Sequence, residues 1–329
     1  MVKEHNGPTM ADVAKKAGVS LGTVSRVVNG EQVGNAYREK VLAAIEALGY
    51  RYNNSGRALR TNRTNIIALI IPNTINPYFG MLAHHINIAL EKRNYKMMIC
   101  FTGYDCDRET EFLQMAQENM VDGIIALTYN PDLVIPENIP FVTIDRFFSE
   151  KVPCVSSDNY SGGVMAARKL RELGCTNMAF MRSASILINE PSKRMDGFAA
   201  ACREMHVPYE TIALDEKQPY SEFESFLEKH FKDGKLEFDG LFIGTDSLAW
   251  EIIKTLKHMG IRVPEDVQVI GFDGIRMFGV QEYIVSTFVQ PVPAIARACV
   301  NTVLSDDPTD RPSLVCLPVT YVSAGTTRD

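Results

Sequence analysis

Charged, amide and aromatic side chains stand directly after the short apolar runs that recur beyond residue 65. They occur in segment 73–79, at Asp145 and Arg146, and at Arg194, Asp246, Asp273 and Gln290. A polyhydroxylated ring needs this chemistry, because its apolar face stacks on an aromatic side chain while its hydroxyls pair with carboxylate, guanidinium and amide groups. We therefore expect a small-molecule site, and we favour a sugar or sugar phosphate over a nucleobase or nucleoside.

The same residues leave two other functions open. Asp145 and Asp273 could form the acid and base pair of a sugar-processing enzyme, and the site alone would suit a sugar-binding protein without a DNA role. The sequence holds no nucleophile–base set and no phosphate-cradling glycine loop, and Gly18-Val-Ser-Leu-Gly22 lacks the buried strand that must precede a hydrolase nucleophile elbow. We expect a protein that is not an enzyme and uses no cofactor.

The pattern beyond residue 65 predicts the elements that position these side chains. Short apolar runs alternate with helical periodicity, as in parallel sheets with helices on both faces. Two successive series indicate two lobes, and such folds bind ligands at the carboxyl ends of their strands. We expect strands at 66–71, 96–100, 123–127 and 141–144, then at 177–181, 240–243 and 267–271, and helices at 81–93, 108–119, 165–173, 192–205 and 247–259.

The first sixty residues predict three short helices. Thr9 opens the first with a capping signature, Ser20 can cap a second over 21–28, and Gly49 ends a third over 36–48. Two helices joined by a tight glycine-containing turn describe a helix-turn-helix unit, whose second helix can lie in the major groove of DNA. The third helix is expected to turn inward the apolar residues Val41, Leu42, Ile45 and Leu48.

The second helix carries the side chains that could read DNA. Arg26 can offer a bidentate fork to guanine, and Leu21 an apolar contact to a thymine methyl. The outward candidates are Leu21, Gly22, Thr23, Ser25 and Arg26. Phosphate contacts are expected from Thr9, Ser20 and Asn29, together with the backbone N–H groups at the helix starts.

Charge is distributed unevenly along the chain. The net charge is −6, but residues 1–63 carry ten basic and five acidic residues, so that the first part is positive and the rest strongly negative. A basic head on an acidic body is expected if only the head meets phosphate.

Residues 9–30, from Thr9-Met-Ala-Asp to Val-Val-Asn-Gly30, resemble the headpiece signature of the lactose-repressor (LacI/GalR) family. Segments such as Arg194-Met-Asp-Gly-Phe198 and Gly271-Phe-Asp273 extend the resemblance over the body, which is also similar to periplasmic sugar-binding proteins. The resemblance implies an α/β protein with an all-α headpiece and a two-lobed periplasmic-binding-protein-like body. It further implies a ligand-switched repressor that binds a near-palindromic double-stranded operator as a homodimer.

The resemblance also assigns roles to particular positions. Those that hold the ligand in the family match Asn76, Tyr78, Phe79, Asp145, Arg146, Arg194, Asp273 and Gln290. Thr245 is a departure, because asparagine is usual there. Leu21 and Gly22 are non-polar, so we expect base specificity to rest on Arg26 and on DNA shape.

A polar, basic segment over 53–63 separates the two parts. Read from its composition, this segment is a solvated linker. The resemblance implies instead a short helix that forms only on DNA, with Leu59 wedged into the minor groove and Arg57 near phosphates.

We expect a headpiece over 1–53, a hinge over 54–63 and a body over 64–329. Lobe 1 of the body is expected at about 64–158 and 290–312, and lobe 2 at about 159–289 and 313–329. The seven scattered cysteines form no C-x-x-C pair, which indicates reduced, mostly buried thiols and no metal site. No signal peptide and no membrane-length apolar run of about 18–20 residues is present, so we expect a cytoplasmic protein.

Overall fold

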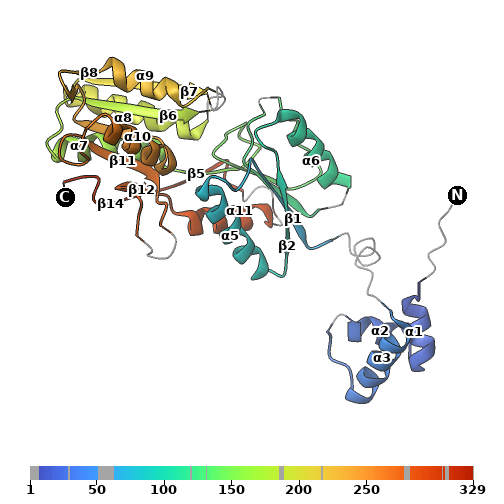
Figure 1. Cartoon of the computed structure of the whole chain (residues 1–329). Coiled ribbons are helices and arrows are strands. Elements are labelled where there is room, and N and C mark those ends of the chain that lie inside the picture. The colour runs from blue at the N-terminus through green and yellow to red at the C-terminus, as the bar shows by residue number, and fades with distance from the viewer. Residues whose placement is uncertain are drawn as a thin grey trace. The chain divides into compact units, whose positions relative to one another are not determined.

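The computed structural model divides the chain into two compact units, 1–64 and 65–329 (Figure 1). The structure describes residues 7–28, 30–50, 63–118, 121–130, 132–184, 189–215, 218–277, 282–305, 307 and 311–328.

The first unit contains the three predicted helices: α1 (Met10–Ala17), α2 (Leu21–Val28) and α3 (Asn35–Leu48). Thr9 and Asp12 form a capping box, because the Thr9 side chain accepts the Asp12 N–H and the Asp12 carboxylate accepts the Thr9 N–H. Gly18 ends α1 with a φ of 64°, a left-handed conformation that glycine adopts without strain. Ser20 caps α2, since its Oγ accepts the Thr23 N–H at 3.1 Å.

A small apolar core holds these helices together. Its buried members are Val13, Ala14, Val24, Val27, Val41 and Ala44. The inward placement expected for Leu42 is wrong, because its side chain is 53% exposed. Successive residues of a helix point about 100° apart, so the face of α3 that presents Val41 and Ala44 to the core turns Leu42 toward solvent.

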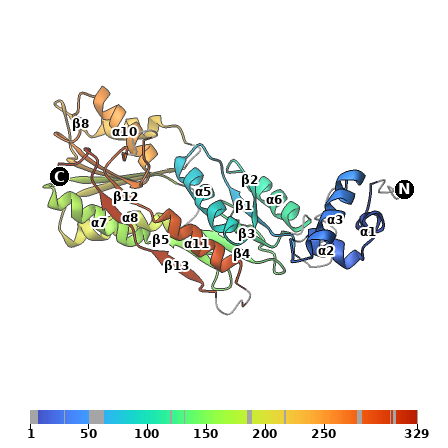
Figure 2. The same ribbon diagram turned by 90° about the horizontal axis from the view of Figure 1, so that it is seen from below.

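The first sheet of the second unit has six parallel strands (Figures 1 and 2). Helices α5 (Pro77–Glu91) and α11 (Val292–Val303) pack on one face, and α6 (Cys106–Glu118) packs on the other. In spatial order the strands are β13 (Leu314–Leu317), β5 (Cys154–Ser157), β4 (Phe141–Ile144), β3 (Gly123–Ala126), β1 (Ile66–Ile71) and β2 (Lys96–Phe101).

The second sheet repeats this architecture, with one antiparallel edge strand, β14. Helices α7 (Asn159–Glu172) and α8 (Lys193–Glu204) cover one face, and α9 (Ser221–Lys229) and α10 (Asp246–His258) cover the other. In spatial order the strands are β14 (Thr320–Val322), β12 (Thr287–Val289), β11 (Gln268–Asp273), β10 (Gly240–Ile243), β6 (Met178–Ala184) and β7 (Tyr209–Asp215). A 3₁₀ turn, η1 (Glu190–Ser192), precedes α8, and a hairpin of β8 (Phe231–Lys232) and β9 (Lys235–Leu236) follows α9.

The predicted fold class is confirmed, but one predicted lobe boundary is wrong. The chain passes between the sheets at residue 158, at 290–291 and at 318–319. The last passage was expected after residue 312. Strand β13 belongs to the first sheet instead, because it pairs in parallel with β5 from Leu314 opposite Cys154 to Leu317 opposite Ser157.

Helices α7 and α8 approach each other unusually closely. A Cβ atom built on Gly163 would lie 2.0 Å from the Arg194 carbonyl oxygen, and one built on Gly197 would lie 2.1 Å from the Tyr160 carbonyl oxygen. No side chain fits at either position, so the two backbones pack directly against each other. This packing places the start of α7 beside the start of α8.

All seven cysteines are free thiols, and five of them are buried. No helix in the described part of the chain combines the length and the apolar character needed to cross a bilayer.

Candidate effector site and DNA interface

A cavity of about 110 Å³ lies between the two sheets of the second unit, at the carboxyl ends of their strands. The scale is that of a single ring, since a cavity of about 150 Å³ can hold benzene. Its lining residues are Asn76, Tyr78, Phe79, Tyr104, Leu127, Thr128, Tyr129, Ile144 and Asp145 from the first lobe, Phe180, Arg182, Ser183, Asn189, Pro191, Arg194, Gly244, Thr245 and Asp273 from the second, and Gln290 from a crossing segment.

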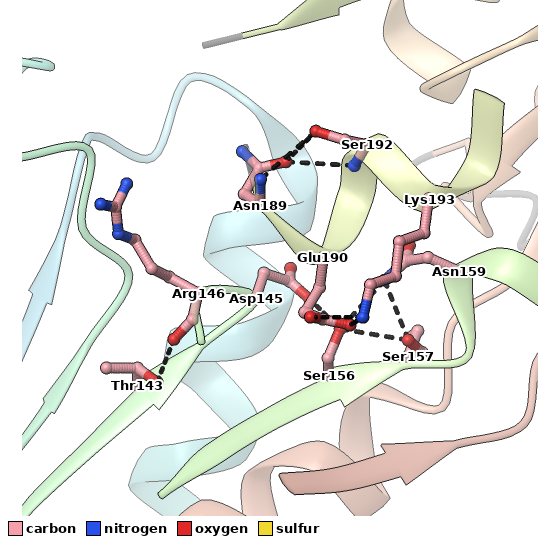
Figure 3. Close-up of polar contacts among 10 residues, drawn as sticks. All are labelled: Thr143, Asp145, Arg146, Ser156, Ser157, Asn159, Asn189, Glu190, Ser192 and Lys193. Carbon is pink, nitrogen blue, oxygen red and sulfur yellow. Dashed lines mark hydrogen bonds and ion pairs between the residues drawn. The ribbon is translucent and has the colours of Figure 1, made fainter. Parts of the chain in front are cut away.

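The cavity brings together most of the residues expected to bind a ligand. These are Asn76, Tyr78, Phe79, Asp145, Arg194, Thr245, Asp273 and Gln290. Arg146 is not among the lining residues: its side chain extends away from Asp145 (Figure 3), and its guanidinium carbon lies 4.8 Å from the centroid of the Phe148 ring. The side chains of Asp145 and Arg146 therefore point in different directions, and only Asp145 lines the cavity.

Several lining residues were not expected from the sequence, although most of them follow shortly after a predicted strand, where a ligand site was expected. Tyr104 follows the second strand, Tyr129 follows the third, and Arg182 follows the expected strand at 177–181. Asn189 belongs to a connecting segment before η1, and no local pattern marked it.

The first-lobe wall of the cavity is largely aromatic. The rings of Tyr78 and Phe79 lie edge to face at 5.8 Å between centroids, and those of Tyr104 and Tyr129 at 4.9 Å. Asn76 places the first pair by capping α5, because its Oδ1 accepts the Tyr78 N–H at 3.0 Å. These rings offer apolar faces on which a ligand ring can stack.

The buried carboxylate of Glu109 in α6 holds the loop that carries Tyr129. Its oxygens accept the N–H groups of Tyr129 at 2.9 Å and of Asn130 at 3.2 Å. Burial raises the pKa of Glu109, while hydrogen bonds from Thr128 and from these backbone groups lower it. The aromatic wall is therefore fixed from behind by a polar anchor.

Arg194 organises the second-lobe wall. Its Nε donates to Asn159 Oδ1 and its Nη1 donates to the Gly244 carbonyl, both at 2.6 Å. Its guanidinium carbon lies 3.7 Å from the centroid of the Phe272 ring, within cation–π distance. Burial lowers the pKa of Arg194, and the nearby Asp273 and Asp145 raise it. The guanidinium plane is thus held from several sides.

Two aspartates complete the polar wall. Asp145 Oδ1 accepts a hydrogen bond from Ser156 Oγ at 2.6 Å, and Asp273 Oδ1 accepts one from Gln290 Nε2 at 2.7 Å. Burial raises the pKa of Asp145, and raises that of Asp273 to about 8. Both residues have positive φ angles, 58° and 130°, which are uncommon for residues with a side chain.

Two polar atoms in this cavity are buried without a hydrogen-bond partner among the described residues: the Tyr78 hydroxyl and Asp273 Oδ2. Leaving a buried polar group unsatisfied costs about 1–3 kcal/mol. A ligand that carries hydroxyl groups can satisfy both atoms, so the cavity has the chemistry of a binding site.

The two lobes also touch beside the cavity, around Glu190 of η1 (Figure 3). The Glu190 N–H donates to the Asp145 carbonyl at 3.0 Å, which joins the second lobe to the end of β4. The Glu190 carboxylate accepts from Lys193 Nζ at 2.8 Å through each oxygen. Asp145 therefore contributes its side chain to the cavity and its backbone to the contact between the lobes.

In the first unit, α2 presents the side chains expected to read DNA. Leu21 is 52% exposed, Gly22 and Arg26 are exposed, and Thr23 and Ser25 are half-buried. The Thr23 hydroxyl lies 2.9 Å from Ser20 Oγ within the cap of the helix. Of the other expected DNA contacts, Thr9 and Ser20 are exposed at the helix starts, and Asn29, Arg57 and Leu59 lie outside the described residues.

Comparison with known proteins gives matches over both units. Residues 9–53 match the model of bacterial regulatory proteins of the lacI family, and residues 167–327 match a periplasmic binding protein-like domain. A sucrose operon repressor from Pediococcus pentosaceus is 33% identical over 306 residues, covering 90% of this chain and 91% of that protein. A ribose operon repressor from Halalkalibacterium halodurans is 33% identical over 291 residues, covering 86% of each chain.

The fold comparison agrees. The structure of the Lac repressor bound to ONPG in the repressed state matches with a TM-score of 0.81 and 21% sequence identity, covering 98% of this chain and 100% of that one. At this identity the likeness shows a shared fold.

Proposed function

Because this chain belongs to the lacI family of bacterial regulatory proteins, we propose that it is a transcriptional repressor whose affinity for operator DNA is switched by a carbohydrate. The observation that carries the carbohydrate assignment is the pair of unpartnered buried atoms, the Tyr78 hydroxyl and Asp273 Oδ2, in a cavity with an aromatic wall; no partner for either occurs in the described part of the chain. The names of two relatives, repressors of a sucrose and a ribose operon, support the same class of effector.

The protein binds its operator as a homodimer, and the two copies of α2 lie in successive major grooves of a near-palindromic site. Arg26 donates to guanine, Leu21 contacts a thymine methyl, and Gly22 contributes no base contact. Thr9, Ser20 and Asn29 contact phosphates, and Thr23 and Ser25 flank the base-reading positions. The positive charge of residues 1–63 supports this assignment.

The switch operates through the segment that joins the two units. Leu59 wedges into the minor groove and Arg57 lies near a phosphate when the hinge is helical on DNA. Effector closes the two lobes, changes the spacing of the paired hinges and releases the operator. Replacement Leu59→Ala should weaken operator binding sharply and leave effector affinity alone, whereas unchanged operator affinity would contradict this role.

The named relatives are operon repressors, which supports a cavity that binds its ligand and does not transform it. The Asp145 carboxylate is engaged by Ser156, and the raised pKa of Asp273, about 8, keeps it protonated at neutral pH. A protonated Asp273 can donate a hydrogen bond to a ligand hydroxyl. The protein acts where the chromosome is, in the cytoplasm.

DNA binding is tested by fluorescence anisotropy with a duplex from the region upstream of its own gene, at low salt. Arg26→Ala should weaken binding about 5- to 150-fold, the range of about 1–3 kcal/mol for a bidentate base contact. Arg38→Ala is the matched control, because Arg38 is an exposed arginine on α3 of the same unit. Equal effects of the two variants, or no binding to any duplex, would contradict the proposal.

Effector class is tested by thermal denaturation with a panel of sugars, sugar phosphates, nucleobases and nucleosides, because a ligand that binds only the folded state raises the melting temperature. A sugar or sugar phosphate that raises it should also release the duplex. The aromatic wall would accept a nucleobase as well, so a shift with a purine alone would replace the carbohydrate assignment.

A further inference from the structure

We propose that the cavity contains a subsite for an anionic oxygen group, built on Arg182, so that the effector is a sugar that carries a phosphate ester or a carboxylate. This inference rests on the proposed function, because it assigns one part of the effector. Arg182 was not among the residues expected from the sequence to bind a ligand.

Arg182 lies near the end of β6 and is only 6% exposed. Residues two apart on a strand share a face, and Phe180, two positions earlier, also lines the cavity. Phe180 packs among Phe198 and Phe242 at 5.9 and 5.1 Å between ring centroids. Arg182 therefore lies on the same face of the sheet as this aromatic cluster, near the strand end that meets the cavity.

The sequence keeps space for this side chain at Gly244. A Cβ atom built on Gly244 would lie 2.8 Å from the Arg182 Cβ, too close for any substituent there. Gly244 is not among the glycines with positive φ, so it is needed for room and not for backbone conformation. Its carbonyl oxygen accepts from Arg194 Nη1 at 2.6 Å. Two arginines therefore meet at one glycine in the cavity wall.

The charges around these arginines favour an anion. The charged side chains that line the cavity are Arg182, Arg194, Asp145 and Asp273. Since burial raises the pKa of Asp273 to about 8, this carboxyl is mainly protonated at pH 7 and does not offset an arginine. Among the lining residues the charged basic side chains then outnumber the ionised acidic ones, and a guanidinium has five N–H donors, so it can accept a ligand anion beside its other partners.

The neighbouring groups suit an anion as well. Asn189 accepts from the Ser192 N–H at 3.1 Å through its Oδ1, which leaves its amide nitrogen to donate into the cavity it lines. A guanidinium binds phosphate and carboxylate through two parallel hydrogen bonds. The anionic group then lies at the second-lobe wall while the sugar ring stacks on Tyr78 and Phe79 of the first.

Titration calorimetry on the full chain tests the subsite with matched ligands. The probes are glucose, glucose 6-phosphate and glucuronate, then fructose and fructose 6-phosphate, with inorganic phosphate alone. In at least one series the anionic member should bind ten-fold or more tightly than its parent sugar. Comparison of the phosphorylated sugars with glucuronate identifies whether the subsite binds a phosphate or a carboxylate.

Replacement Arg182→Met keeps the apolar stem and removes the charge. It should weaken binding of the anionic sugar roughly 10- to 100-fold, as expected for a charged hydrogen-bonding group, and leave the parent sugar within about two-fold, the scatter of such comparisons. Arg182→Lys should recover part of the loss, because it restores a point charge without the fork. Arg168→Met is the control, since Arg168 is an exposed arginine of α7 paired with Glu204. Thermal denaturation establishes that each variant is folded.

Parent sugars that bind as tightly as their anionic forms would overturn the subsite, as would an equal loss of parent and anionic sugar in Arg182→Met. If a neutral sugar still releases the operator in either case, the proposed function survives without the subsite. If no sugar of any charge binds, both proposals fail together.

Discussion

The two walls of the cavity use different physical means to hold a ligand. The first-lobe wall consists mainly of aromatic and aliphatic side chains that continue into the core of the first sheet, such as Tyr78 and Phe79. The second-lobe wall is more polar, with Arg182, Asn189, Arg194 and Asp273 in its lining, and Arg194 is held by hydrogen bonds to Asn159 and to the Gly244 carbonyl. The first wall supplies contact area, whereas the second requires donors and acceptors at defined positions.

The difference has a consequence for substitutions. A change to an aromatic side chain packed on the core affects mainly its immediate neighbours. In the polar wall, residues that share a hydrogen-bond partner are coupled, so a change to one of them affects the others. Effects in the polar wall should therefore be larger and less additive than those in the aromatic wall.

The largest effect is expected for Arg194→Met. The change removes a buried cation and leaves Asn159 Oδ1 and the Gly244 carbonyl without their donor, so the free energy of unfolding should fall by about 3–5 kcal/mol and effector binding should be lost. Arg168→Met, which breaks the exposed pair with Glu204, should cost less than about 1 kcal/mol. Urea denaturation measures both, and similar losses in the two variants would remove the distinction between the walls.

The next effect is a dependence of stability on pH through Asp273. Burial raises its pKa to about 8 in the folded protein, against about 3.9 in the unfolded chain. Between these values the folded state holds a proton that the unfolded state has lost, so Asp273 makes stability fall as pH rises from about 4 to about 8, with no further change above.

Replacement Asp273→Asn should remove this contribution. The stability of the variant relative to the parent should rise with pH up to about 8 and then level off, as measured by urea denaturation from pH 5 to pH 9. A constant difference across this range would show that Asp273 is ionised in the folded protein.

A smaller effect is expected for Gln290→Leu at the crossing segment. Gln290 links the lobes by donating to Asp273 and accepting from Ser157 Oγ, each at 2.7 Å. Leucine fills similar space and leaves both partners unsatisfied, which should lower the free energy of unfolding by about 1–3 kcal/mol. Thermal and urea denaturation measure this loss, and an unchanged midpoint would show that water replaces the link.

The smallest effect, and the sharpest test of the aromatic wall, is expected for Tyr78→Phe. The hydroxyl has no partner among the residues that the structure describes, so its removal should not lower stability, while effector affinity should fall by about 0.5–1.5 kcal/mol. Tyr220→Phe is the counterpart, because its hydroxyl lies 2.8 Å from Thr255 Oγ1 away from the cavity. Tyr220→Phe should lower stability and leave the affinity for the effector, measured by calorimetry, unchanged. A loss of stability in Tyr78→Phe together with a loss of affinity in Tyr220→Phe would contradict this assignment.

The strands best predicted from the sequence are those whose unbroken apolar runs are buried on both faces, such as β1 and β10. Strand β13 was missed because its apolar run is only four residues long and lies at a sheet edge, with Leu314 exposed instead of buried. Helix α7 was expected to begin at Met165, because Gly162-Gly163 reads as a break. Those glycines are instead required by the close contact with α8, which no local pattern reveals.

The candidate site was predictable as far as strand ends define it. Asp145 and Asp273 were found because each follows a strongly apolar strand, and Tyr104, Tyr129 and Arg182 could have been found in the same way. The outward position of Arg146 was not predictable in this way, because Asp145 follows β4 with a φ of 58°, where the alternation of an extended strand does not apply.

The contact between Gly163 and Gly197 also determines how motion can spread from the cavity. Helix α7 begins two residues after β5 leaves the first sheet, and α8 carries Arg194 on a backbone that lies against α7 without intervening side chains. Helices packed backbone to backbone have no side-chain layer that could absorb a displacement, so we expect α7 and α8 to move together. A shift of Arg194 would therefore reach, through α7, the crossing segment at residue 158 that joins the two lobes.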